Sequence, residues 1–265
     1  QLRLVWESGQ IHVQIMGKVQ LEIFRSLVQQ RFDLNITLED RRIFYKETIA
    51  NTVEGVGHFE PLRHYAECHL LLEPLPRGSG LVFDTVCSTD VLDLQYQKLI
   101  ISHLSEKVHR GVLTGAPTTD MKITLLVGRA HVKHTEGGDF RQATYRAIRQ
   151  GLMKGESVLL EPYYCFEINV PIEYMGKVMT DIKRMSGSFD APVHSGEVAD
   201  IKGELSVYEA MDYWDELYSY TKGQARISHR FGGYTECHNA DEVLSNINYE
   251  AERDVENTPD SVFCS

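Results

Sequence analysis

The chain has 265 residues, a formal net charge of −11 and 42% hydrophobic residues, the composition of an ordinary globular protein. The length suggests about two domains, and no apolar run reaches the roughly 20 residues that would cross a bilayer. The start lacks the pattern of a signal peptide, and the acidic total argues against a nucleic-acid binder, which usually carries a basic surface.

Residues 1–47 are predicted to form two strands, a helix and a third strand. Apolar residues alternate over Leu2–Trp6 and Ile11–Ile15, recur at helical spacing from Val19 to Phe32, and form a short run at Leu34–Leu38. A unit of this size is too small to bury a good core, and its strands would have open edges. We therefore expect half of a domain that is either disordered or paired with another molecule, for example in an edge-strand-mediated dimer.

Residues 48–158 carry a mixed pattern of strands and helices. Apolar residues alternate over Arg63–Leu72, and a Pro/Gly-rich stretch ends that run. A helical stripe then extends from Leu92 to Val108. A strand at Met121–Val127 and a helix from about Phe140 to Lys154 follow.

Residues 159–246 show the clearest pattern. Strands are predicted at Tyr163–Val170, Phe189–His194, Glu197–Leu205 and Ala225–Phe231, with one helix after Pro171 and another after Ser206. The second helix begins with the capping-box pattern of Ser206 and Glu209. This βαββαβ order is the ferredoxin-like split βαβ fold.

Charge is unevenly distributed. Residues 111–158 carry a net charge of +3, whereas residues 159–265 carry −12. The basic side chains of this island are Lys122, Arg129, Lys133, Arg141, Arg146, Arg149 and Lys154, with His131 and His134 among them. A solvated charged face is the simpler interpretation, and contact with a phosphate backbone is the alternative.

Motifs for catalysis are missing from the sequence. It has no G-x-x-x-x-G-K-[ST] phosphate loop, no G-x-G-x-x-G dinucleotide loop and no G-x-S-x-G nucleophile elbow. His131, His134 and Asp139 are a weak alternative for a metal site, because a Gly-rich loop holds ligands poorly. The five cysteines form no Cys-x-x-Cys pair. We expect no catalytic residue, no bound metal or cofactor, reduced thiols and a cytoplasmic location.

Several strings resemble one family when taken together. They are Ile15–Ile23 (IMGKVQLEI), Tyr45–Thr48 (YKET), Gly115–Lys122 (GAPTTDMK), Leu160–Pro162 (LEP), Glu173–Gly176 (EYMG) and Thr221–Arg226 (TKGQAR). In this order and spacing they resemble domains III, IV and V of elongation factor G. Val19-Gln20, the string Pro74–Gly80 and the string Glu136–Phe140 resemble the ribosomal-protection tetracycline-resistance branch of that family.

The resemblance implies an α+β, multidomain architecture. Residues 1–47 would be the second half of domain III, a half ferredoxin-like segment, and residues 48–158 would be domain IV, an α/β fold like domain 2 of ribosomal protein S5. Residues 159–246 would be the ferredoxin-like domain V, and residues 247–265 an acidic C-terminal tail. The GTPase domain would lie outside this chain, so GTP and magnesium are implied only for that missing part.

The resemblance also implies a site and a partner. Domain IV of the family reaches the decoding centre of the small ribosomal subunit, so we expect contact with its rRNA. The carried-over tip consists of Thr114, Gly115, Ala116, Pro117, Thr118, Thr119, Arg129, Ala130, His131, Val132, Lys133, His134, Thr135 and Glu136. His131 matches the position of a functional histidine in elongation factor G.

The predicted function is the ribosome-binding part of a GTPase that releases tetracycline from the ribosome. Two alternatives stay open: a related translation factor without a role in resistance, and a stand-alone RNA- or ribosome-binding module. We expect no enzymatic activity from this fragment, ribosome-dependent GTPase activity from the full-length protein, and no membrane partner.

Overall fold

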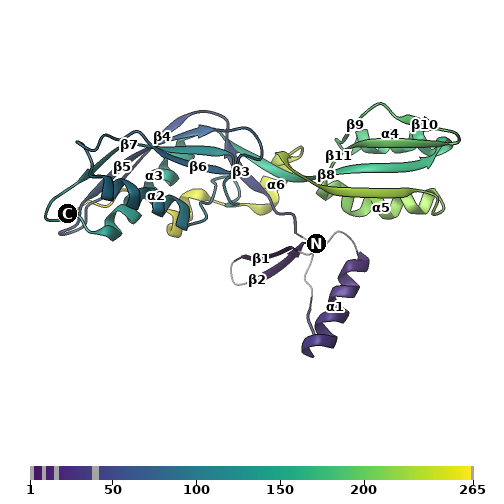
Figure 1. Cartoon of the computed structure of the whole chain (residues 1–265), viewed down its shortest axis with the longest axis horizontal. Helices are drawn as coiled ribbons and strands as arrows, with labels where there is room; N and C mark the ends of the chain where they lie inside the picture. The colour runs from purple at the N-terminus through teal and green to yellow at the C-terminus, as the bar shows by residue number, and fades with distance from the viewer. Residues whose placement is uncertain (1–2, 8–9, 15–17, 38–41, 264–265) are drawn as a thin grey trace.

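The computed structural model of the protein describes residues 3–7, 10–14, 18–37 and 42–263. Two of its sheets lie end to end and give the molecule an elongated shape, and a small hairpin with one helix lies beside their junction (Figure 1). Helices and mostly antiparallel strands share the chain, which confirms the predicted α+β class. No helix in the described ranges is long and apolar enough to span a membrane.

The N-terminal segment contains a two-stranded sheet and a helix. Strands β1 (Arg3–Glu7) and β2 (Gln10–Gln14) pair with each other, and helix α1 spans Lys18–Phe32. The predicted strand at Leu34–Leu38 is wrong for residues 34–37, which form no strand, and Leu38 lies outside the described residues. The described strands of this segment pair only with each other, so an extended run here has no ladder to join.

Helix α1 leaves part of its apolar stripe uncovered. Ile23 is 53% exposed, Leu27 is 40% exposed and Phe32, the last helical residue, is 68% exposed. Large apolar side chains at such levels normally pack against a neighbouring element. The segment therefore presents an apolar surface that nothing in the described part of this chain covers.

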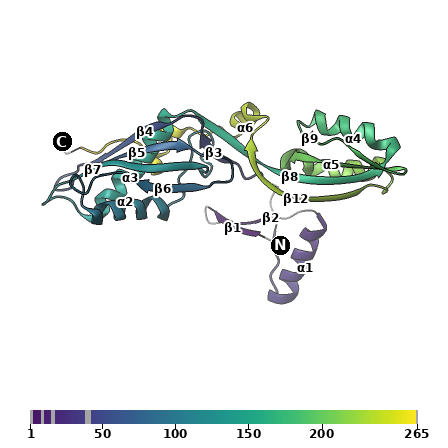
Figure 2. The same cartoon turned by 45° about the horizontal axis from the view of Figure 1, so that its top comes forward.

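The first large sheet has the strand order β4-β5-β7-β6, with β6 parallel to β7 and the other pairs antiparallel. Helices α2 and α3 lie together on one side of it (Figure 2). The elements are β4 (Val53–Phe59), β5 (Ala66–Pro74), β6 (Leu81–Thr85), β7 (Met121–Ala130), α2 (Leu94–Glu106) and α3 (Gly137–Lys154).

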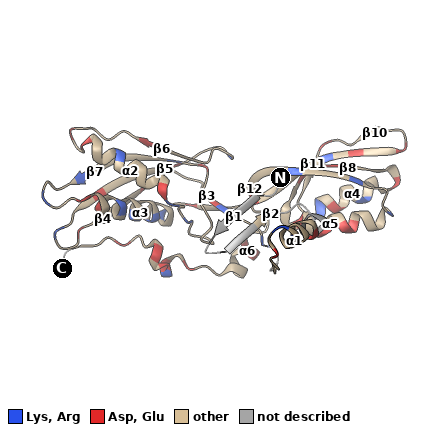
Figure 3. Cartoon of the chain, turned by 60° about the horizontal axis from the view of Figure 1, so that its bottom comes forward, with Lys and Arg blue, Asp and Glu red and all other residues tan. Residues whose placement is uncertain are grey.

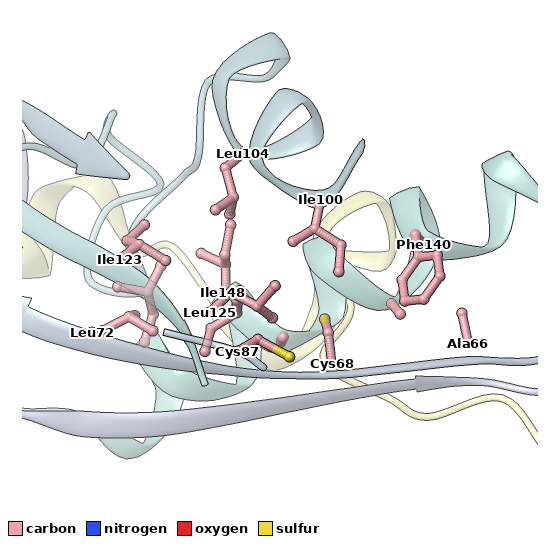
Figure 4. Close-up of a cluster of buried hydrophobic side chains, with 14 of the residues drawn as sticks. Ala66, Cys68, Leu72, Cys87, Ile100, Leu104, Ile123, Leu125, Phe140 and Ile148 are labelled. Atoms are coloured by element: carbon pink, nitrogen blue, oxygen red, sulfur yellow. The ribbon is translucent and has the colours of Figure 1, made fainter. Parts of the chain in front are cut away.

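The core of this domain follows the periodicity of its elements. Alternate residues of β5, among them Cys68 and Leu72, are fully buried and face Ile100 and Leu104 of α2 and Ile148 of α3 (Figure 4). Strand β4 approaches α3 so closely that it contains glycine on that side. A Cβ atom on Gly55 or Gly57 would overlap the backbone oxygen of Ala147 or Ala143.

The second large sheet is organised around β8 (Ser157–Pro171). Strands β11 (Val198–Ser206) and β12 (Arg226–Glu236) flank β8, and helices α4 (Ile172–Arg184) and α5 (Val207–Tyr220) bury the apolar side of the sheet. The predicted strand Phe189–His194 is instead two short strands that pair with β11. These are β9 (Ser188–Phe189) and β10 (Val193–Ser195).

Strand β8 connects the two large units without a break. Its first residues, Ser157–Leu160, pair with β3 (Lys46–Ile49), and its later residues pair with β11. The predicted boundary between residues 158 and 159 therefore falls inside one continuous strand. A small cluster around Leu159, with Tyr45 on one side and Val243 on the other, packs the junction.

The C-terminal segment returns to the first domain. After helix α6 (Ala240–Ile247), two short 3-10 helices follow, η1 (Ala251–Arg253) and η2 (Val255–Asn257). Val262 then forms a parallel bridge with Phe59 at the end of β4. The predicted acidic tail is thus packed along the domain surface up to residue 263 rather than projecting from the molecule.

Candidate functional site

The two loops of the predicted tip lie at opposite ends of one strand. Residues 114–119 precede β7, and residues 131–136 follow it. Since a strand rises about 3.3 Å per residue, the ten residues of β7 separate the loops by about 30 Å. The structure therefore does not bring the predicted residues together, and the assignment of both loops to one tip is wrong.

The loop at residues 114–119 surrounds a buried carboxylate near the junction. Glu47 is 1% exposed, and its Oε1 accepts hydrogen bonds from the backbone nitrogen and hydroxyl of Thr114 at 2.8 and 2.9 Å. The backbone nitrogens of Leu113 and Ala116 also donate to Glu47, at 2.8 and 3.2 Å. The polar groups of this loop are therefore hydrogen-bonded within the protein.

The rest of that motif is equally enclosed. Thr118 and Thr119 are 7% and 8% exposed, and Asp120 is 1% exposed. Asp120 Oδ1 accepts from the backbone nitrogens of Gly78 and Gly80, which fixes the Pro/Gly-rich turn before β6. Thr118, Thr119 and Asp120, which belong to the motif, therefore lie inside the protein rather than on its surface.

The loop at residues 131–136 lies at the end of the molecule away from the second domain. Its conformation is set by Thr135, whose hydroxyl accepts from His131 N and donates to Tyr65 O, both at 2.6 Å. The His131 and His134 rings lie 4.6 Å apart, and Val132 between them is fully exposed. Lys133 is also exposed.

A second loop, not anticipated from the sequence, lies against it. Residues 60–65 connect β4 to β5, and Tyr65 N donates to His134 O at 2.9 Å. His64 Nδ1 lies 2.9 Å from Asp139 Oδ1. Arg63 is exposed and has a positive φ of 66°, and Leu62 is 74% exposed. We call residues 60–65 and 131–136 the free end.

The C-terminal segment reaches the same place. Val262 N donates to His58 O, and Glu60 N donates to Val262 O, so the segment extends the edge of β4 just before the free end. The ring of Phe263 stacks on His58 at 4.7 Å. The last described residues of the chain therefore lie beside the free end, at the far end of domain IV in Figure 1.

A carboxylate at the base of the free end is held in its charged form. Glu67 lies 3.0 Å from His69 Nε2, accepts from the Tyr65 hydroxyl at 3.2 Å and lies 3.8 Å from Arg129 Nε. Burial raises the pKa of Glu67, but these hydrogen bonds outweigh burial and lower its pKa overall. Burial, and then the charge of Glu67, raises the pKa of Tyr65.

The basic island of the sequence is dispersed in space. Lys122 pairs with Asp84 at 2.8 Å, Arg141 pairs with Glu106 at 2.7 Å, and Arg149 is 2% exposed. Figure 3 shows basic and acidic residues intermixed along the domain rather than gathered in one patch. At the free end the cations are Arg63 and Lys133, with Arg129 at the end of β7.

The weak metal alternative is not supported by the geometry. Asp139 accepts from the backbone nitrogen of Glu136 and contacts His64, so it is engaged away from His131. Within the described ranges, no group of three or more His, Cys, Asp or Glu side chains is placed to bind a metal ion. Cys68, Cys87, Cys165 and Cys237 are free thiols.

Two family models match this chain. The model of elongation factor G, domain IV, covers residues 41–156, and the model of the elongation factor G C-terminus covers residues 158–243. The chain belongs to the elongation factor G family. Domain IV is therefore the unit that carries the free end, and the second large sheet belongs to the C-terminal domain of the family.

Individual relatives agree with this family. The chain is 30% identical over 233 residues to elongation factor G 2 of Syntrophus aciditrophicus, covering 86% of this chain and 34% of that protein. It is 31% identical over 230 residues to the tetracycline resistance protein TetP of Clostridium perfringens, covering 86% of this chain and 35% of that protein. The chain thus spans about a third of the length of these curated relatives.

A solved structure shares the fold. A crystal structure of a protein from Thermus thermophilus superposes with a TM-score of 0.77 at 23% identity, covering 93% of this chain and 38% of that one. The match extends the likeness in fold beyond the residues covered by the two family models. The match to the family includes no GTPase domain, because the two models are those of domain IV and the C-terminus.

Proposed function

We propose that this chain is the ribosome-binding C-terminal part of an elongation factor G-like GTPase, and that the free end of domain IV contacts small-subunit rRNA at the decoding centre. The observation that carries the proposal is the joining of loops 60–65 and 131–136 at the end of domain IV farthest from the second sheet. Exposed Arg63 and Lys133 offer cations for phosphate there, and Glu60 and Glu136 balance them, so the formal charge of the free end is zero in a protein with a net charge of −11.

The proposed role of that contact is release of tetracycline from the ribosome. The relation to TetP supports it, while the nearly equal identity to elongation factor G 2 favours a translation factor without a drug role as the second candidate. GTP and magnesium would bind in a preceding domain of the full-length protein, which we propose to be cytoplasmic.

The test is expression of the full-length gene in a tetracycline-sensitive bacterium. We expect a rise in the tetracycline concentration tolerated, and loss of that rise when Lys133→Ala and Arg63→Ala are combined. Unchanged tolerance together with ribosome-stimulated GTP hydrolysis would leave the translation-factor function. Absence of ribosome binding by the full-length protein would contradict both.

Residues 1–47 are proposed to be the second half of domain III. Support comes from exposed Ile23, Leu27 and Phe32 on α1, which need a covering partner. In the full-length protein the preceding half would cover them, and in the isolated chain a second copy would cover this apolar face of α1 while pairing through the open edges of β1 and β2. Light scattering of the isolated chain, with Ile23→Gln as the comparison, tests the dimer: we expect the variant to be more monomeric.

A further inference from the structure

A cavity of about 120 Å³ lies in domain IV apart from the free end, where α3 meets the C-terminal segment. Four basic side chains line it: Lys107 after α2, Arg110 in the following loop, and Arg146 and Arg149 on α3. Glu256 of η2 contributes an acidic side chain to the same wall. Like charges at this density repel one another unless an anion lies among them.

The two guanidinium groups on α3 hydrogen-bond to uncharged acceptors. Arg149 donates to the carbonyl oxygens of Gly111 and Ala251 and to the Tyr249 hydroxyl, each at 2.9 Å. Arg146 donates to the carbonyl oxygen of Asp260 at 2.8 Å and to Gln142. These bonds position the guanidinium groups, and the carboxylates of Asp254 and Asp260 act on Arg149 and Arg146 through charge.

One buried atom of the cavity lining lacks a partner among the described residues, and one lysine is held by an aromatic ring. Arg149 is 2% exposed, and its Nε has no acceptor within the part of the chain that the structure describes. Lys107 Nζ lies 4.7 Å from the centre of the Tyr145 ring. Burial lowers the pKa of Lys107, Asp254 and Glu256 oppose that change, and Arg110 and Arg149 add to it. An anion beside Lys107 would act in the same direction as the carboxylates.

We propose that this cavity binds a small tetrahedral oxyanion of the phosphate class, held chiefly by Lys107, Arg146 and Arg149. The size of the cavity, about 120 Å³, exceeds the roughly 10–15 Å³ that a single water requires, so it accommodates more than a bridging water. A bound oxyanion would connect α3 to the C-terminal segment, because Arg146 and Arg149 already contact residues of that segment.

The test is calorimetric titration of the chain with inorganic phosphate, against chloride at equal ionic strength. We expect saturable binding and a rise in melting temperature. Lys107→Gln should weaken binding by at least about tenfold, and Glu256→Gln should tighten it by about threefold or more, since one removes an attractive charge and the other a repulsive one. Lys98→Gln, which removes an exposed lysine of α2, is the matched control and should bind like the unmodified chain.

The expected changes in phosphate affinity have opposite signs for Lys107→Gln and Glu256→Gln. A general loss of folding would weaken binding in both variants, so the pair distinguishes the two explanations. Phosphate that fails to bind saturably, or that binds equally to the Lys107→Gln chain, would overturn the proposal. Competition assays then identify the source of the anion. Competition by a short RNA without terminal phosphates would assign a phosphodiester, and competition by AMP alone would assign a free or terminal phosphate.

Discussion

Oε1 of Glu47 accepts hydrogen bonds from both the backbone nitrogen and the hydroxyl of Thr114, at 2.8 and 2.9 Å. Replacing Glu47 by Gln turns one acceptor oxygen into a donor that faces backbone N–H groups. We expect the free energy of unfolding to fall by about 1–3 kcal/mol, the usual cost of unsatisfied buried groups. Urea denaturation measures it. Glu156→Gln, at an exposed position just before β8, is the control and should change little.

The bonding of Thr114 to Glu47 predicts that the loop at residues 114–119 and the free end behave differently in a ribosome-binding assay. Lys133→Ala and Arg63→Ala should each reduce the slope of log affinity against log salt by up to about 0.7, the value for a lost single-strand phosphate contact. Thr114→Ala should leave the slope unchanged, because Thr114 bonds to Glu47 within the protein. A reduced slope for Thr114→Ala would instead show that the loop at residues 114–119 contacts the ribosome.

Glu106 predicts a dependence of stability on pH. The hydrogen bond from the Tyr145 hydroxyl, followed by that from Arg141, lowers the pKa of Glu106 to about 2 from an ordinary 4.5. A carboxylate with a depressed pKa stabilises the folded state above its unfolded pKa, and that contribution is lost as pH falls from 4.5 towards 2. Melting temperatures between pH 6 and pH 3 should therefore fall further for the unmodified chain than for Glu106→Gln. Parallel curves would contradict this.

The close approach of β4 to α3 predicts opposite effects for two glycine substitutions. Gly57→Ala would place a methyl group against the backbone of Ala143, and we expect a loss of about 2 kcal/mol or more. Gly176→Ala lies at an exposed position within α4 with open space around it, and should gain about 0.5–1 kcal/mol from helix propensity. Equal effects in chemical denaturation would disprove the packing explanation.

Elements with strong periodicity could be predicted from the sequence, and short or glycine-containing ones could not. The predicted helix from about Phe140 to Lys154 corresponds to α3, Gly137–Lys154. Strand β4 lacks the alternation of apolar residues that predicts a strand, because Gly55 and Gly57 occupy its buried positions. The close approach of α3 leaves no room for a side chain there. Strand β3 has only four residues, too few for an alternation to be recognised.

The site was harder to predict than the fold because family motifs and surface contacts are different residues. Glu47 and Asp120 stand out in the sequence, yet both are buried acceptors. The sequence did contain the information needed to separate the loops, since a single predicted strand, Met121–Val127, lies between them. Loop 60–65 carries no motif, and its place follows only from the contact between Tyr65 and His134.

Strand β8 has a mechanical consequence for the whole molecule. Domain IV and the second sheet share this strand, which continues through the crossing at Pro162, between its pairing with β3 up to Leu160 and its pairing with β11 from Tyr163. A rotation of the second sheet would be transmitted along this strand to domain IV. The displacement of each residue would increase with its distance from the axis of rotation. The loops around Arg63 and Lys133 would then move the furthest, although no force acts on them directly.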